Sequence, residues 1–201
     1  MELMTGGARA IAANRPGLQP QLRGRLLAID FEASCLPRDG RSYPIEVGVA
    51  DSDGRRRSWL IRPAPEWADW HWSAEAEALH GISRQRLAAA GLPPVRVLAE
   101  LGSSVSGGRI FADSTLDDDW LRTLARAAGV RPPFRVGHFA TLLDELGTTP
   151  AEMAEAEAAA AAADLRPHRA ADDAARLGLM IGALAAAAGR RAGARPLERA
   201  A

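Results

Sequence analysis

The chain has 201 residues, and its 25 Lys and Arg balance its 25 Asp and Glu, so the formal net charge at pH 7 is zero. This balance excludes a global electrostatic field that would draw the protein to nucleic acid or to a membrane surface. The single cysteine, Cys35, excludes an internal disulfide framework and a zinc site built from cysteines, which fits a reducing cytoplasm. No apolar run approaches the roughly 18 residues that cross a bilayer, so we expect a soluble cytoplasmic protein with no membrane segment.

Composition divides the chain into a leader, one domain and a tail. Residues 1–23 mix Gly, Pro, Ala and Arg without a period, which predicts a disordered leader. Residues 24–189 carry periodic apolar patterns and are numerous enough for one domain with a sizeable core. We expect a flexible tail over residues 190–201.

The first part of this domain predicts an antiparallel meander of three strands. The apolar residues 26–29 begin a strand that is buried on both faces. Residues 44–50 form the second strand and residues 57–62 the third, with the turn Asp51-Ser-Asp-Gly54 between them. Short turns join strands that are neighbours in the sheet, and antiparallel pairing follows.

Helices and two further strands alternate in the rest of the domain. Ser73 and Ser83 are typical first residues of two short helices. We expect strands over residues 109–112 and 134–136, and helices over residues 95–105, 116–128, 139–146, 150–165 and 170–188. The predicted class is therefore α/β, with a mixed five-stranded sheet, three strands antiparallel and then two parallel, flanked by helices.

Two acids stand at the end of the first strand. Asp30 and Glu32 are two residues apart, so in a strand they point to the same face while Phe31 points to the other. Two carboxylates side by side in a partly buried place repel each other, and a hard divalent cation between them would offset that repulsion. The alternative is that the strand has already ended and both acids are solvated in the following loop.

Two more acidic clusters follow later in the chain. Asp113 closes the fourth predicted strand, and Asp117-Asp-Asp119 opens the next helix. Acids at a helix N-terminus are also explained by the helix dipole alone. The second cluster, His168-Arg-Ala-Ala-Asp-Asp173, opens the last helix.

These patterns, taken in order, resemble the DEDDh branch of the 3′→5′ exonucleases, the superfamily of ribonuclease T and of the proofreading subunit of bacterial DNA polymerase III. The resemblance covers residues 24–189 and lies in the following residues: Asp30 and Glu32 with Leu36; Asp117 followed by Trp120 and Leu121; His80-Gly-Ile82; and His168, Ala170, Asp173 and Ala174. Two departures stand out, because Cys35 occupies a place where the family often has Gly, and Asp113, Asp118 and Asp119 compete with Asp117. The family has a ribonuclease-H-like fold, which the expected strand order matches.

The resemblance implies a site as well as a fold. Asp30, Glu32, Asp117 and Asp173 would hold two divalent ions, Mg²⁺ or Mn²⁺, and His168 would be the general base. The product would be a nucleoside 5′-monophosphate released from a free 3′ end of nucleic acid. Candidate substrate contacts are Leu36, Ile82, Arg166 and Arg169, although solvated arginines flanking a loop explain the last two equally well.

Several alternatives stay open from the sequence. The chain is compatible with DNA or RNA, short or long, single-stranded or with a base-paired end. A homodimer is compatible with the resemblance, since several members of the family pair. A catalytically silent nucleic-acid-binding or interaction module on the same fold is the alternative function. An aspartyl phosphatase would have a second Asp where this chain has Glu32.

Overall fold

The computed structural model describes residues 24–194, so the expectations for the leader and for the last seven residues of the tail lie outside the described part of the chain. A single mixed sheet of five strands crosses the domain in the order β3-β2-β1-β4-β5. Its strands are β1(Arg25–Ala33), β2(Pro44–Asp51), β3(Arg56–Leu60), β4(Gly108–Ala112) and β5(Val136–His138). The pairs β1–β2 and β2–β3 are antiparallel, whereas β1–β4 and β4–β5 are parallel. The predicted sheet is confirmed, including its change of direction.

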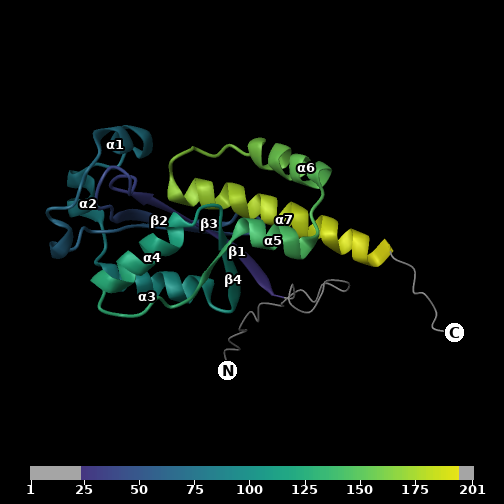
Figure 1. The fold of residues 1–201 in the computed structure, drawn as a ribbon, viewed down its shortest axis with the longest axis horizontal. Coiled ribbons are helices and arrows are strands. Elements are labelled where there is room, and N and C mark those ends of the chain that lie inside the picture. The colour runs from purple at the N-terminus through teal and green to yellow at the C-terminus, as the bar shows by residue number, and fades with distance from the viewer. Residues whose placement is uncertain (1–23, 195–201) are drawn as a thin grey trace, which may run out of the picture.

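Seven α-helices and a short 3-10 helix (Pro65–Trp67) complete the fold of residues 24–194, and Figure 1 shows how the α-helices are arranged around the sheet. They are α1(Ala74–His80), α2(Arg84–Ala90), α3(Pro94–Val105), α4(Leu116–Ala127), α5(Phe139–Leu146), α6(Pro150–Ala161) and α7(Ala170–Ala194). Ser73 and Ser83 cap α1 and α2 as expected, because each hydroxyl accepts a hydrogen bond from a backbone N–H in the first turn. None of these helices has the combined length and apolar character that crossing a membrane requires.

Several element boundaries differ from the sequence prediction, among them those of β3, β5, α6 and α7. Strand β5 begins at Val136 rather than at residue 134, because Phe134 packs against the core beneath the sheet instead of pairing with β4. Helix α6 ends at Ala161, four residues early. Helix α7 continues to Ala194, so residues 190–194 are helical and not part of a flexible tail. Arg191 explains this extension, since its guanidinium pairs with Glu152 of α6 and donates to the carbonyl oxygen of Gly147 after α5.

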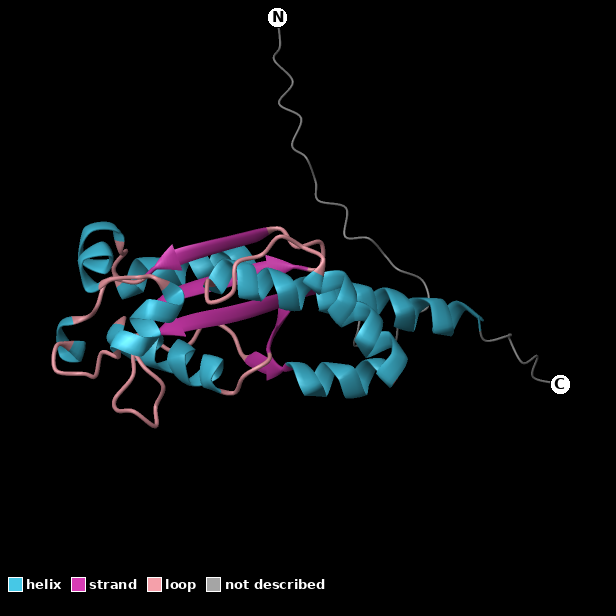
Figure 2. Cartoon of the chain, turned by 90° about the horizontal axis from the view of Figure 1, so that it is seen from above, coloured by secondary structure: helices cyan, strands magenta, loops and turns pink. Residues whose placement is uncertain are grey.

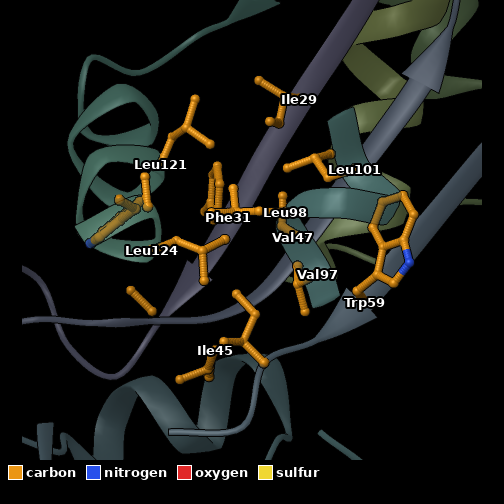
Figure 3. Packing of buried hydrophobic residues seen from close by; sticks show 14 of the residues in the cluster. Ile29, Phe31, Ile45, Val47, Trp59, Val97, Leu98, Leu101, Leu121 and Leu124 are labelled. Atoms are coloured by element: carbon orange, nitrogen blue, oxygen red, sulfur yellow. The ribbon is translucent and has the colours of Figure 1, made fainter. Parts of the chain in front are cut away.

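The sheet separates two apolar cores, and β1 contributes to both. On one face, the side chains of Leu27, Ile29 and Phe31 pack with those of α3 and α4, as Figure 3 shows for part of this cluster. On the other face, Leu26 and Ala28 pack against α5, α6 and α7. The prediction of a first strand buried on both faces is confirmed, and it places β1 at the centre of the molecule.

Helix α7 lies directly on the sheet and extends beyond it at its C-terminal end (Figures 1 and 2). A Cβ atom added to Gly48 of β2 would lie 2.1 Å from the backbone carbonyl carbon and oxygen of Ala170. Further along, a Cβ on Gly178 would lie 2.5 Å from the carbonyl oxygen of Asp51. The start of α7 is therefore held at backbone contact distance from β2, where no larger side chain fits.

We expect Gly48→Ala to destabilise the protein by about 1–3 kcal/mol, because the new methyl group meets backbone that cannot move aside cheaply. Thermal unfolding measures the effect. The matched control is Gly189→Ala in α7, where a Cβ meets nothing within 4 Å. That change should be neutral or stabilise by about 0.5–1 kcal/mol, since Ala is the better helix former. A Gly48→Ala protein that melts with the wild type would contradict this close packing.

Candidate metal centre

Strand β1 carries two carboxylates towards the face that α7 covers. The strand continues through both acids to Ala33, with Asp30 opposite Gly48 and Glu32 opposite Glu46 of β2. Phe31, between them, points into the core on the other face. The alternative in which both acids follow the end of the strand is therefore wrong.

Carboxylates from three elements gather around Asp30. Its carboxylate oxygen lies within 4.8 Å of carboxylate oxygens of Asp113 and Asp117 on one side, and the three form one group. Glu32 and Asp173 form a second group with Asp30 at the same spacing. Asp30 is common to both groups, so the two candidate ligand sets share one residue.

A hydrogen bond from the backbone of β1 holds Asp117 in this cluster. Asp117 lies in the first turn of α4, is only 1% exposed, and its Oδ1 accepts a hydrogen bond of 3.0 Å from the Phe31 N–H. Its competitors face elsewhere: Asp118 pairs with Arg122 at 2.7 Å, and Asp119 is exposed. The structure thus brings Asp117 to Asp30, and it also brings Asp113, which follows β4.

Asp173 is held by the segment that precedes α7. The backbone N–H of Arg169 donates a hydrogen bond of 3.2 Å to its carboxylate. His168 is exposed and its φ is 58°, in the left-handed region that a residue with a side chain seldom adopts. His168 therefore stands in the loop before the helix, next to the carboxylate of Asp173.

Burial raises the pKa of all four carboxyls, and repulsion between acids raises those of Asp30, Glu32 and Asp117 further. Burial is the largest cause of the raised pKa of Asp30, followed by the negative charges of Asp117 and Glu32. Burial, Asp173 and Glu46 raise the pKa of Glu32 to about 8, although Arg169 acts in the opposite direction. Burial and Asp113 raise the pKa of Asp117 to about 7, and burial raises that of Asp173.

This donor set fits a divalent cation. Across residues 24–194, no arginine or histidine side chain forms an ion pair with Asp30, Glu32 or Asp117. Converging carboxylate oxygens without a protein cation are the ligands that Mg²⁺ and Mn²⁺ prefer. A bound cation would remove the repulsion that raises these pKa values.

The four predicted substrate contacts fall in different places. Leu36 is 41% exposed, just after β1, and Arg166 is exposed before α7. Ile82 is completely buried in the core beneath the sheet, and its contact with substrate stays a prediction. Arg169 is not free to reach a phosphate, because its guanidinium pairs with Glu46.

Two residues near the candidate metal ligands, Asp113 and Glu46, were not placed there by the sequence patterns. Asp113 appeared only as a competitor for Asp117, although its position directly after a predicted strand could have placed it beside Asp30. Glu46 interrupts an apolar strand and is 1% exposed, and that interruption was the signal for a buried charge in need of a partner.

Comparison with solved structures defines the fold. The nuclease domain of 3′hExo, a DEDDh family member bound to rAMP, is 18% identical with a TM-score of 0.60, over 78% of this chain and 89% of that one. A 3′-exonuclease with 3′-end-specific recognition of the histone mRNA stem-loop is 15% identical with a TM-score of 0.58, over 78% and 79%. The zinc-bound complex of E. coli exonuclease I with single-stranded DNA is 16% identical with a TM-score of 0.56, over 78% of this chain and 39% of that one.

The chain thus has the ribonuclease-H-like fold of the DEDDh-type 3′–5′ exonuclease domains. No protein-family model matches the sequence, and no curated protein matches it.

We expect the metal-free protein to lose stability as the pH rises. Between the ordinary carboxyl pKa near 4 and folded values of about 7 for Asp117 and about 8 for Glu32, the folded state holds protons that the unfolded state has released. The free energy of unfolding therefore falls with rising pH across this window. Melting temperatures in a chelator, from pH 5 to pH 8.5, measure the effect.

Asp30→Asn should flatten that dependence and raise the metal-free melting temperature at high pH, because it removes the charge shared by both groups. Asp118→Asn, which removes the half-buried partner of Arg122, is the control and should leave the slope unchanged. Saturating Mg²⁺ should also flatten the wild-type slope. A metal-free wild type whose stability increases with pH would contradict the description of this cluster.

Proposed function

We propose that the protein is a metal-dependent 3′–5′ exonuclease that hydrolyses the terminal phosphodiester bond of a nucleic acid and releases nucleoside 5′-monophosphates. The observation that carries this proposal is the pair of carboxylate groups sharing Asp30, on a fold in which the neighbouring structures are 3′ exonucleases. Asp30, Glu32, Asp117 and Asp173 are the residues that would hold two ions, with Asp113 as a further carboxylate beside Asp30 and Asp117. When bound, such ions supply the positive charge that activates an attacking water and stabilises the leaving 3′ oxygen.

His168 is the residue that would take the proton from the attacking water. Its place supports this role, since it is exposed and directly precedes Arg169, whose backbone N–H donates to Asp173. An imidazole suits general-base work because it changes charge close to neutral pH. The left-handed backbone at His168 is also typical of a functional position, where surrounding contacts offset local strain.

The remaining residues would meet the substrate around this centre. Leu36 offers an exposed apolar side chain for a terminal base, and the exposed Arg166 is the candidate phosphate contact. The cytoplasmic location and the homodimer remain predictions.

The first functional test uses a substrate with a free 3′ end. We expect Mg²⁺- or Mn²⁺-dependent release of 5′-mononucleotides from labelled DNA or RNA oligonucleotides, detected by gel electrophoresis and chromatography. A matched oligonucleotide blocked at its 3′ end should survive. Equal degradation of both would exclude exonuclease action from the 3′ end, whereas binding without turnover would favour the silent nucleic-acid-binding module.

The second test concerns His168. We expect His168→Ala to lower the rate about 10²–10⁴-fold at saturating metal and to flatten the decline of activity at acid pH, since the variant lacks the base. His138→Ala is the control, because His138 is also exposed but caps α5, where its Nδ1 accepts from the Ala140 N–H at 3.2 Å. Similar losses in both variants would contradict the assignment of the base.

A further inference from the structure

A buried ion pair joins the sheet to the segment that carries His168. Glu46 of β2 is 1% exposed. Arg169 donates two hydrogen bonds to its carboxylate, from NH2 to Oε1 at 2.8 Å and from Nε to Oε2 at 3.1 Å. The Ala170 N–H donates to the same Oε2 at 3.3 Å, and the Ser58 hydroxyl donates to Oε1 at 3.0 Å. Four donors therefore converge on one carboxylate. An arginine fork of this kind fixes orientation as well as charge, which a lysine would not do.

The Glu46–Arg169 pair constrains the backbone beside His168. Two of the three residues bonded to Glu46 are those that follow His168, and His168 has the only positive φ of a non-glycine residue in the described chain. A residue in that conformation keeps it only when its surroundings determine it. Asp173 accepts a hydrogen bond from the backbone of Arg169 on the helix side, and Glu46 holds Arg169 and Ala170 from the strand side. The segment at His168 is thus held by Asp173, which is a candidate metal ligand, and by Glu46, which is not.

The geometry on β2 supports the same conclusion. Glu46 and Gly48 are two residues apart and share the face that α7 covers, so the ion pair and the close backbone contact at Ala170 lie side by side. Glu46 also stands opposite Glu32 on the neighbouring strand. Arg169 consequently faces both acids, and its positive charge lowers the pKa of Glu32 against the effect of burial.

We propose that Glu46 and Arg169 form a positioning pair, which sets the place of His168 relative to Glu32 and Asp173 and does not itself contact substrate. This inference rests on the proposed function. It replaces the expectation that Arg169 binds a phosphate, since both of the guanidinium nitrogens that face Glu46 are engaged there. The pair differs from a purely structural salt bridge because its loss should change the reaction rate more than the stability or the affinity for substrate.

The first experiment measures the order of the segment without using activity. Hydrogen–deuterium exchange is followed over residues 164–170 of the metal-free full chain in the wild type and in Glu46→Gln. We expect exchange in Glu46→Gln to be faster by about tenfold or more, because local opening no longer breaks the ion pair. The control is Glu145→Gln, which alters the other two-bond Arg–Glu pair, Arg109–Glu145, at the opposite end of β1. Unchanged exchange in a folded Glu46→Gln would overturn the proposal.

The second experiment separates positioning from phosphate binding. At saturating Mg²⁺ we expect Glu46→Gln and Arg169→Lys each to lower kcat about 10- to 100-fold while KM stays within about threefold, as expected for a misplaced catalytic group. Glu145→Gln and Arg109→Lys should keep the wild-type kcat. If Arg169 instead binds a phosphate, Glu46→Gln frees its guanidinium and leaves kcat unchanged, while Arg169→Lys raises KM. That pattern would overturn the proposal.

Two safeguards keep the outcomes distinct. Arg169→Lys retains a positive charge beside Glu46, so it gives a folded variant if Glu46→Gln does not fold, and its exchange and kcat are then decisive. A wild-type protein that degrades no substrate would overturn the proposed exonuclease function, while the exchange measurement would still decide whether the pair orders the segment.

Discussion

Like charges packed together at one end of β1 are the constraint on which this structure depends. A carboxylate oxygen of Asp30 lies within 4.8 Å of carboxylate oxygens in two pairs of acids. Burial raises the pKa of every carboxyl that we propose as a metal ligand. Such a cluster needs fixed donors if it is to stay in place before a cation arrives. The protein supplies them from its backbone: the Phe31 N–H for Asp117, and the Arg169 N–H for Asp173. Backbone donors hold the carboxylates while leaving other oxygen lone pairs free for a ligand.

The close approach of α7 is what delivers Asp173 to β1. Glycines and alanines line the contact, and at Gly48 and Gly178 the helix and β2 meet at backbone distance. Small side chains each bury little apolar surface, so this part of the interface fixes the position of α7 and contributes little hydrophobic free energy. The larger side chains Leu177, Ile181 and Leu184 provide the burial further along α7. Stability and placement therefore come from different parts of one helix.

Much of this arrangement could be predicted from the sequence, and the remainder has a common cause. Strand order, the shared face of Asp30 and Glu32, and the caps at Ser73 and Ser83 follow from periodicity and local hydrogen bonding, which a single sequence displays. The burial of Ile82, the addition of Asp113 to the cluster and the pairing of Arg169 with Glu46 depend on elements distant in the chain. The extension of α7 to Ala194 likewise depends on Arg191 reaching α6 and the end of α5. No local pattern encodes which distant element a side chain will meet.

The central position of β1 also determines when the carboxylate cluster can form as the chain is synthesised. That strand leaves the ribosome first among the described elements, yet its partners in the sheet are β2, made directly after it, and β4, made much later. Asp173 belongs to the last helix, so the carboxylates meet only when nearly all of the described chain has emerged and α7 has docked. A domain generally folds as a unit once its sequence is available. A nascent chain that has not yet exposed α7 would accordingly lack an assembled centre, and any nuclease activity would begin only after this whole domain has emerged.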